Sequence, residues 1–261
     1  MIKNPLLKLT FLMIVYFLST STSFALIINP AIPITHTVTV QPIIVSDDDG
    51  GNTANYFGSP AEESSITGLI DQIWAQAGID IVFLAANTWN NTFANWGAGG
   101  APDNGGNTRP TTDLSTIVTN GAASGVTNAN PNILNMFFVR IAAGFGLLSD
   151  NYAAGLAFRP GNGVTQFVGT NLLGFLGGQE AIAGVVAHEI GHNLGLPHTN
   201  DGSAPEGLMT SGGSGDRLTS AQKDLALTSN LAVAAVPLPA AFWFLASGLL
   251  ILFRINKKAF M

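Results

Sequence analysis

The stretch HEIGHNLGLPH, from His188 to His198, constrains the fold of this chain more than any other segment. It holds three of the four histidines in the sequence, at relative positions 0, 4 and 10, with Glu189 beside the first. An apolar stripe with helical spacing leads into this stretch and continues through its first part: Ile182, Val185, Val186, Ile190 and Leu194. Gly195 is a typical helix stop. The sequence therefore predicts a helix from Gln179 to Leu194, followed by a turn that carries the last histidine.

Residues four apart on a helix project from the same face, so the imidazoles of His188 and His192 can both reach one cation. Gly195 lets the chain leave the helix in a left-handed conformation, and His198 can then fold back toward the same ion. Three neutral imidazole nitrogens suit zinc at about 2.0–2.1 Å and leave a fourth position for water. We expect Glu189 to act as the general base on that metal-activated water. Alternatively, the histidines are only packed residues of an amphipathic helix, but the low histidine content argues against this.

The pattern HExxHxxGxxH resembles the signature of the metzincin clan of zinc endopeptidases. That clan carries a methionine turn beneath the metal, and Met209 in Gly207-Leu208-Met209-Thr210 is similar in position. The resemblance implies that Glu189 is catalytic, that the three histidines bind zinc, and that Gly195 and Met209 support the site. It also implies that an edge strand binds the substrate as an added antiparallel strand. Gly155 to Phe158 (GLAF) resembles this strand in the matrixin and reprolysin-like branches.

The chain departs from the clan in three respects. No tyrosine follows Met209, so the tyrosine ligand of astacin-like and serralysin-like members has no counterpart there. The chain has no cysteine, which excludes a cysteine switch, disulfides and thiolate zinc ligands. The interval from Ala25 to His36 is too short for a folded propeptide. The subfamily and the mechanism of latency stay open.

The resemblance and the order of segments together predict an α/β (α+β) fold. This is a metzincin-like zincin domain with a twisted mixed sheet, an antiparallel edge strand, an active-site helix and a C-terminal helix. A strand at His36 to Ser46, a helix that begins with the capping box Ser59-Pro60-Ala61-Glu62 and stops at Gly78, and a strand at Ile79 to Leu84 favour neighbouring parallel strands.

The remaining segments are assigned from the same signals. Three further strands are predicted, at Ile133 to Ala142, Gly155 to Arg159 and Val164 to Gly169. A final helix is expected from Ser220 to about Ser229, capped by Thr219 and Gln222, and Leu231 to Ala235 is interpreted as a linker. Ala85 to Pro131 is rich in Asn, Gly, Thr and Ala, so it is expected to be a surface loop that rims a cleft.

Both ends of the chain have the composition of sorting segments. Residues 1–25 carry Lys3 and Lys8, a short apolar run and Ser23-Phe24-Ala25, which predicts a secretory signal peptide. Residues 236–261 begin VPLPA, continue with an apolar stretch and end with basic residues. This resembles the VPLPA type of PEP-CTERM signal, which implies processing by an exosortase in a Gram-negative bacterium. The alternative is a plain tail anchor. Either way, we expect an exported domain of residues 26–235 in the cell envelope or outside the cell, with transient membrane anchoring.

The charge of that domain argues against two classes of partner. Removing both ends takes away five of the ten Lys and Arg residues and none of the sixteen acidic ones, which leaves a formal net charge of −11. Such a domain repels nucleic acid and anionic lipid, so neither is expected as a partner. An extended polypeptide is the expected substrate.

Three weaker signals accompany the histidine motif. Ser220 and Lys223 match the SxxK pattern of serine acyl-enzymes, but a helix start explains them without catalysis. Asp47 to Asn52 (DDDGGN) could bind Ca²⁺ through oxygen ligands, or it is a solvated turn, the reading that the sequence favours. His36 lies in the first predicted strand and is interpreted as structural.

Two functions remain open at this point. The first is a secreted or surface-sorted zinc-dependent endopeptidase with Glu189 as its general base. The second is a catalytically silent metzincin-fold protein that binds a matrix or adhesive partner. The presence of Glu189 together with all three histidines favours the enzyme.

Overall fold

The computed structural model of the protein describes residues 26, 28–97, 110–140, 155–166, 178–199, 207–210 and 215–235. The predicted signal peptide and the predicted C-terminal sorting segment lie outside these ranges. Among the described helices, none is both long and apolar enough to cross a membrane.

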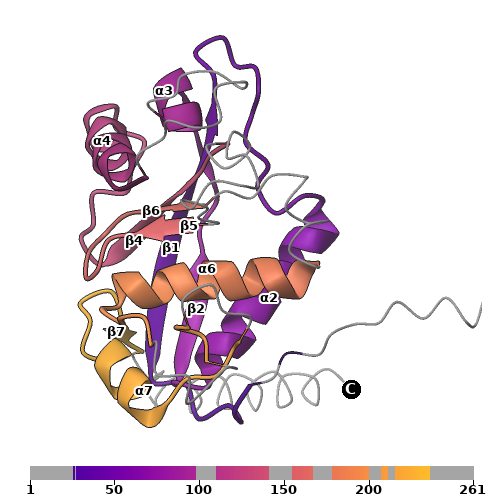
Figure 1. Ribbon diagram of the computed structural model, residues 1–261, viewed down its shortest axis with the longest axis vertical. Coiled ribbons are helices and arrows are strands. Elements are labelled where there is room, and N and C mark those ends of the chain that lie inside the picture. Colours follow the sequence, from indigo (N-terminus) through magenta and orange to yellow (C-terminus); the bar gives the residue numbers. More distant parts are fainter. Residues whose placement is uncertain are drawn as a thin grey trace, which may run out of the picture.

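Seven strands of the described ranges form one mixed sheet (Figure 1). They are β1 (His36–Ser46), β2 (Ile79–Phe83), β3 (Asn87–Asn90), β4 (Ile133–Phe138), β5 (Gly155–Ala157), β6 (Val164–Gln166) and β7 (Val233–Ala234). The main order is β2-β1-β4-β6-β5, and β3 and β7 also pair with β1. The strands β2, β3 and β4 run parallel to β1, and β6 runs parallel to β4. β5 is antiparallel to β6 at the end of this order, so the predicted mixed sheet with an antiparallel edge strand is confirmed.

Five helices complete the described fold. They are α2 (Pro60–Ala75), α3 (Thr92–Trp96), α4 (Pro110–Ala123), α6 (Gln179–Asn193) and α7 (Ser220–Ala226). Both predicted capping boxes are present, because Ser59 caps α2 with Glu62 and Thr219 caps α7 with Gln222. These reciprocal bonds satisfy amide groups that a helix start leaves unpaired, and they fix where each helix begins.

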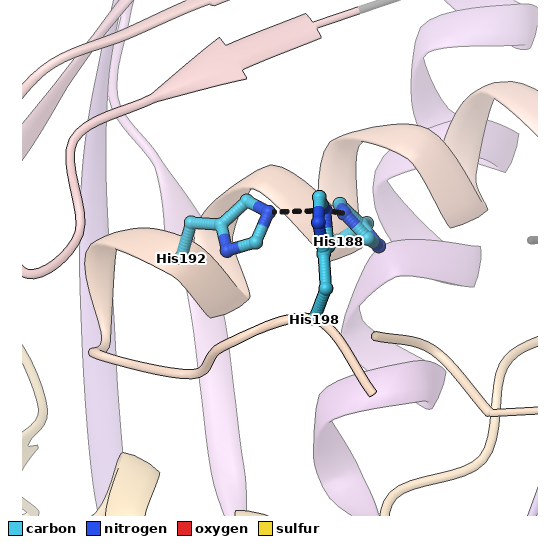
Figure 2. Close-up of side chains that lie close together, drawn as sticks. All are labelled: His188, His192 and His198. Atoms are coloured by element: carbon cyan, nitrogen blue, oxygen red, sulfur yellow. Dashed lines mark hydrogen bonds between the residues drawn. The ribbon is translucent and has the colours of Figure 1, made fainter. Parts of the chain in front are cut away.

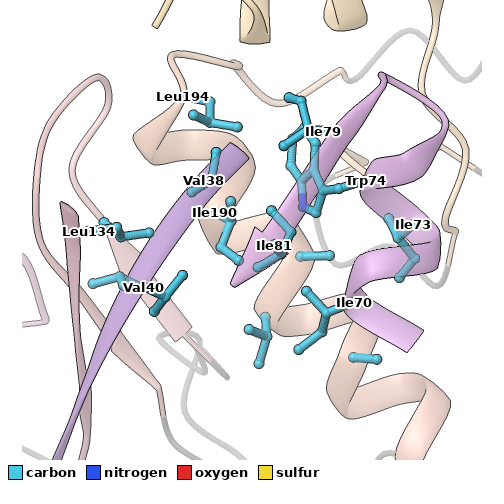
Figure 3. Close-up of a cluster of buried hydrophobic side chains, with 14 of the residues drawn as sticks. Val38, Val40, Ile70, Ile73, Trp74, Ile79, Ile81, Leu134, Ile190 and Leu194 are labelled. Atoms are coloured by element: carbon cyan, nitrogen blue, oxygen red, sulfur yellow. The ribbon is translucent and has the colours of Figure 1, made fainter. Parts of the chain in front are cut away.

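The core is divided by the sheet. Side chains alternate between the two faces of a strand, so Val38 and Val40 of β1 point to one face, while Ile43 and Val45 point to the other. On the first face, shown in Figure 3, β1, β2 and β4 pack against α2 and α6. On the second face, α3 and α4 pack against Phe137 and Trp89. Apolar side chains of the motif helix α6, from Ile182 to Leu194, are therefore buried in this core, and their burial holds the helix against the sheet and α2.

Two sequence-based expectations are wrong. The segment from Ala85 to Pro131 is not one surface loop, because it contains β3, α3 and α4. Its composition is polar, but Trp89, Trp96 and Ile117 are buried and anchor these elements to the sheet. The segment from Leu231 to Ala235 is not a linker either. Leu231 is buried in the core, and β7 pairs with the start of β1.

Candidate metal centre

The end of α6 has the geometry that the sequence predicts. Gly195 has φ +97°, its N–H donates to the carbonyl of His192, and the N–H of Leu196 donates to the carbonyl of Gly191. This pair of bonds is a Schellman turn, which needs a left-handed residue at its corner. The chain therefore reverses just after His192 and returns along the helix with His198.

The three imidazoles of the motif point toward one another (Figure 2). Nε2 of His198 lies 3.1 Å from Nε2 of His188 and 3.0 Å from Nε2 of His192. These residues form the group of potential metal ligands found within the described ranges. His192 is buried, His188 is partly buried and His198 is exposed, so one side of the cluster opens to solvent. The fourth histidine, His36, lies apart in β1, where its Nδ1 contacts the hydroxyl of Thr35.

Hydrogen bonds fix which nitrogen of each helical histidine carries a proton. Nδ1 of His188 donates to the carbonyl of Leu208 at 2.6 Å, and Nδ1 of His192 donates to the carbonyl of Leu196 at 2.8 Å. A carbonyl oxygen can only accept, so Nε2 of each neutral ring presents a lone pair to the cluster. A proton on Nε2 of His198 could form a hydrogen bond to the lone pair of only one of these two rings, and the other lone pair would then face a nitrogen without a donor. A cation bound by all three Nε2 atoms satisfies every lone pair, so the three histidines fit a metal site.

The electrostatic surroundings keep these imidazoles neutral, which is the form that binds metal. Burial lowers the pKa of His188 to about 4, assisted by the neighbouring His192 and His198 and opposed by the Leu208 carbonyl. Burial also lowers the pKa of His192 and of His198, and the positive charge of Arg159 lowers both further.

The predicted methionine turn, residues 207–210, holds two of the histidines. Its Leu208 carbonyl accepts the bond from His188, and its Met209 carbonyl accepts from the N–H of Thr199, directly after His198. Met209 is fully buried against α6, where a Cβ placed on Gly191 would lie 2.5 Å from its sulfur. A side chain at position 191 would therefore push the buried Met209 side chain from its place, so the glycine inside HEIGH allows this close contact.

Glu189 is buried between α6 and the edge strand β5. Only 7% of it is exposed, and burial raises the pKa of its carboxyl to about 8. A Cβ placed on Gly155 of β5 would lie 2.5 Å from Cγ of Glu189 and 2.9 Å from its Oε1. The backbone of β5 therefore passes directly over the glutamate, and any larger residue at position 155 would push the carboxyl away.

One site residue, Asn193, was not recognised from the sequence. Its buried Nδ2 donates to the carbonyls of Phe158, Gly161 and Gly163, which belong to the turn between β5 and β6. A usable signal was present, because position 193 continues the apolar stripe of Val186 and Ile190. A polar side chain on a core-facing stripe indicates a buried hydrogen-bonding partner.

The weaker sequence signals take structural roles. The carboxylate of Asp47 accepts hydrogen bonds from the side chains of Asn52, Asn95 and Trp96, at 2.7–2.8 Å. These donors occupy the oxygens that Ca²⁺ would need, so the geometry favours the solvated-turn reading of DDDGGN. Ser220 and Lys223 lie in the first turn of α7, in agreement with the helix-start reading.

One family model and two solved structures are similar to this chain. Residues 103–199 match the reprolysin-like metallopeptidase family M12B. Archaemetzincin from Methanopyrus kandleri is a similar solved structure, with a TM-score of 0.44 and 14% sequence identity over 75% of this chain and 96% of that one. Metalloproteinase-II from Bacteroides fragilis gives a TM-score of 0.42 and 14% identity over 76% of this chain and 58% of that one. No curated protein matches the chain.

The matched segment contains β5, α6, Glu189 and all three histidines, and it ends one residue after His198. The similarity thus falls on the part of the chain that forms the histidine cluster. Over this segment the chain is similar to a metallopeptidase family, and this supports a metallopeptidase with a metal held by the three histidines.

Proposed function

We propose that the protein is a zinc-dependent endopeptidase that cleaves extended polypeptides. The observation that carries this proposal is the convergence of three Nε2 atoms, 3.0 and 3.1 Å apart, beside a buried glutamate. Tetrahedral zinc with ligands at about 2.0–2.1 Å separates neighbouring nitrogens by roughly 3.3 Å, close to the distances in the cluster. His188, His192 and His198 are the residues that would hold the ion. Bound zinc supplies Lewis acidity, which promotes ionisation of water near neutral pH and polarises a peptide carbonyl.

Glu189 would perform the proton transfers. Its carboxyl is buried, which raises its pKa, while the positive charge of a bound zinc ion would lower it again, and a carboxyl balanced in this way suits a group that takes up and releases a proton. It would accept a proton from the attacking water and deliver it to the departing amine. Gly155 keeps the carboxyl in place from the side of the edge strand, while α6 holds it from the other side.

The edge strand β5 supports an extended substrate. One edge of β5 pairs with β6, and within the described ranges no strand pairs with the other. A free strand edge offers a row of amide and carbonyl groups to an added strand. A polypeptide bound to this edge would be extended and would pass over Glu189. One of its internal peptide bonds would then lie next to the three histidines.

The proposal includes export of the enzyme. The segments 1–25 and 236–261 suit a secretory signal and a PEP-CTERM signal, so we propose an envelope or extracellular location, transient membrane anchoring and processing by an exosortase. Expression with and without residues 236–261 in a Gram-negative host that has an exosortase would test this. We expect the full chain to lose its C-terminus by mass spectrometry and to be released, and an intact C-terminus would refute it.

Activity is tested by incubating the zinc-loaded protein with peptides that are blocked at both ends. We expect internal cleavage by the native protein and loss of about 10³-fold or more for Glu189→Gln with zinc retained. Lys223→Gln, on α7, is a matched surface control and should keep full activity. Zinc binding by both the native protein and Glu189→Gln with no cleavage by either would instead support the silent matrix-binding protein.

A further inference from the structure

The turn that follows the edge strand, residues 158–163, is fixed to the end of the motif helix. Asn193, the residue after His192, donates through Nδ2 to the carbonyls of Phe158, Gly161 and Gly163, at 3.3, 2.8 and 3.0 Å. The N–H of Gly161 donates in return to the carbonyl of Asn193. A turn tied by four hydrogen bonds to one residue has a defined position relative to the neighbouring histidines.

Arg159 is carried by this turn. Pro160 beside it lies against the helix stop, since its Cβ would be 3.9 Å from a Cβ placed on Gly195. The side chain of Arg159 is exposed, and no hydrogen bond or ion pair joins it to another residue of the described ranges. The positive charge of Arg159 contributes to lowering the pKa of both His192 and His198. Arg159 therefore places an exposed positive charge, which no residue of the described ranges neutralises, at the rim of the histidine cluster.

This charge stands out against the rest of the protein. The predicted domain has a formal net charge of −11, so its general field disfavours acidic polypeptides. Another described cation, Arg140, stacks over the ring of Trp96 at 5.2 Å and is committed to that contact. The exposed guanidinium of Arg159 suits a carboxylate, which it can bind through two parallel hydrogen bonds.

The direction of β5 determines which part of a substrate meets Arg159. Gly155 lies against Glu189, so the bond to be cleaved would lie near the start of β5. β5 runs from Gly155 toward Arg159, and a strand added antiparallel to it runs the opposite way. Four residues of extended chain span about 13 Å. Arg159 would therefore face residues on the amino-terminal side of the cleaved bond, between the second and the fourth.

We propose that Arg159 is a specificity-determining residue that selects an aspartate or glutamate on the amino-terminal side of the cleaved bond. This inference rests on the proposed peptidase function and names the substrate class of that site. The groups that carry it are the exposed guanidinium of Arg159, its anchor Asn193 and the free edge of β5.

The test begins with a denatured protein mixture that the native enzyme digests, with the products sequenced to find a cleaved sequence. Peptide pairs are then made with Asp or Asn at the second, third or fourth position before the cleaved bond. We expect the native enzyme to prefer Asp at one of these positions by about two- to fivefold in kcat/KM. The preference should vanish in Arg159→Gln, reverse in Arg159→Glu and persist in Lys223→Gln, which removes one positive charge from α7.

A binding measurement separates recognition from catalysis. Fluorescence anisotropy of the labelled peptides with Glu189→Gln should show the same Asp preference, and Arg159→Gln in that background should abolish it. Cleavage of the Asp and Asn peptides at equal rates by the native enzyme, or a preference that persists in Arg159→Gln, would overturn the inference and leave the peptidase function standing. If no peptide is cleaved, the peptidase function is overturned and this inference with it.

Discussion

The contact between Gly191 and Met209 makes Gly191→Ala an informative substitution. Alanine in a helix interior is more favourable than glycine by about 0.5–1 kcal/mol. Here the new methyl group would lie 2.5 Å from the sulfur of Met209 and 3.2 Å from its Cε. Overpacking of this kind costs typically 1–3 kcal/mol. The net effect on the free energy of unfolding is therefore a loss of between zero and about 2.5 kcal/mol.

Gly68→Ala is a matched control for the difference in helix propensity between alanine and glycine. Gly68 lies within α2, and a Cβ placed there meets nothing within 4 Å. Gly68→Ala should therefore stabilise the protein by about 0.5–1 kcal/mol. Urea unfolding of the metal-free proteins would measure both substitutions on the same scale. The difference between them, about 1–3 kcal/mol, reports the contact with the methionine turn.

Zinc affinity provides the second measurement on Gly191→Ala. The methionine turn supplies the carbonyl that orients His188 and the carbonyl that holds Thr199, next to His198. Losing such an outer contact weakens metal binding by about 10- to 100-fold. Competition with a chelating dye should show this loss for Gly191→Ala and no change for Gly68→Ala. If Gly191→Ala were as stable as Gly68→Ala and bound zinc as tightly as the native protein, the role assigned to the turn would be refuted.

Three further predictions concern other parts of the structure. Asn193→Ala removes the Nδ2 donor from the carbonyls of Phe158, Gly161 and Gly163, of which Gly163 keeps the bond from the N–H of Phe158. The substitution should lower the free energy of unfolding by about 2 kcal/mol, measured in urea, and a change below about 0.5 kcal/mol would contradict the anchor. Burial raises the pKa of Asp47, but hydrogen bonds from Asn52, Asn95 and Trp96, with the charge of Arg140, outweigh it and lower the pKa below 3.8. The ionised carboxylate of Asp47 thus contributes stability that is present above its unfolded pKa and is lost as pH falls through its folded pKa. Below about pH 4 the urea midpoint of the native protein should therefore decrease as pH is lowered, and that of Asp47→Asn should decrease less steeply. Zinc at about 100 times its Kd should stabilise the native protein by about 2.7 kcal/mol in thermal unfolding, and the same zinc concentration should stabilise His198→Ala much less, because that variant binds zinc more weakly.

The sequence predicted the histidine cluster well because its determinants are local. Helical spacing sets His188 and His192 on one face, and Gly195 alone decides where the chain reverses. Both capping boxes were also recognised, because each depends on two residues three positions apart. Short-range chemistry of this kind is fully visible in a single sequence.

The sequence did not reveal the contacts between distant segments. Nothing local in Leu231 to Ala235 shows that its backbone pairs with β1, almost two hundred residues earlier. The contact of Gly155 with Glu189 and the bonds from Asn193 to the turn after β5 likewise depend on how α6 lies across the sheet. The segment from Ala85 to Pro131 is polar on average, so its composition predicted a loop. A few apolar residues in it, such as Ile117 in α4, are buried and attach its helices and strand to the sheet.

X-ray absorption at the zinc edge tests most directly whether His188, His192 and His198 hold one zinc ion. The purified protein loaded with one equivalent of zinc should show three imidazole nitrogens at about 2.0–2.1 Å. His198→Ala should reduce this number to two and weaken binding. A protein that fails to bind zinc, or a spectrum that His198→Ala leaves unchanged, would contradict the account.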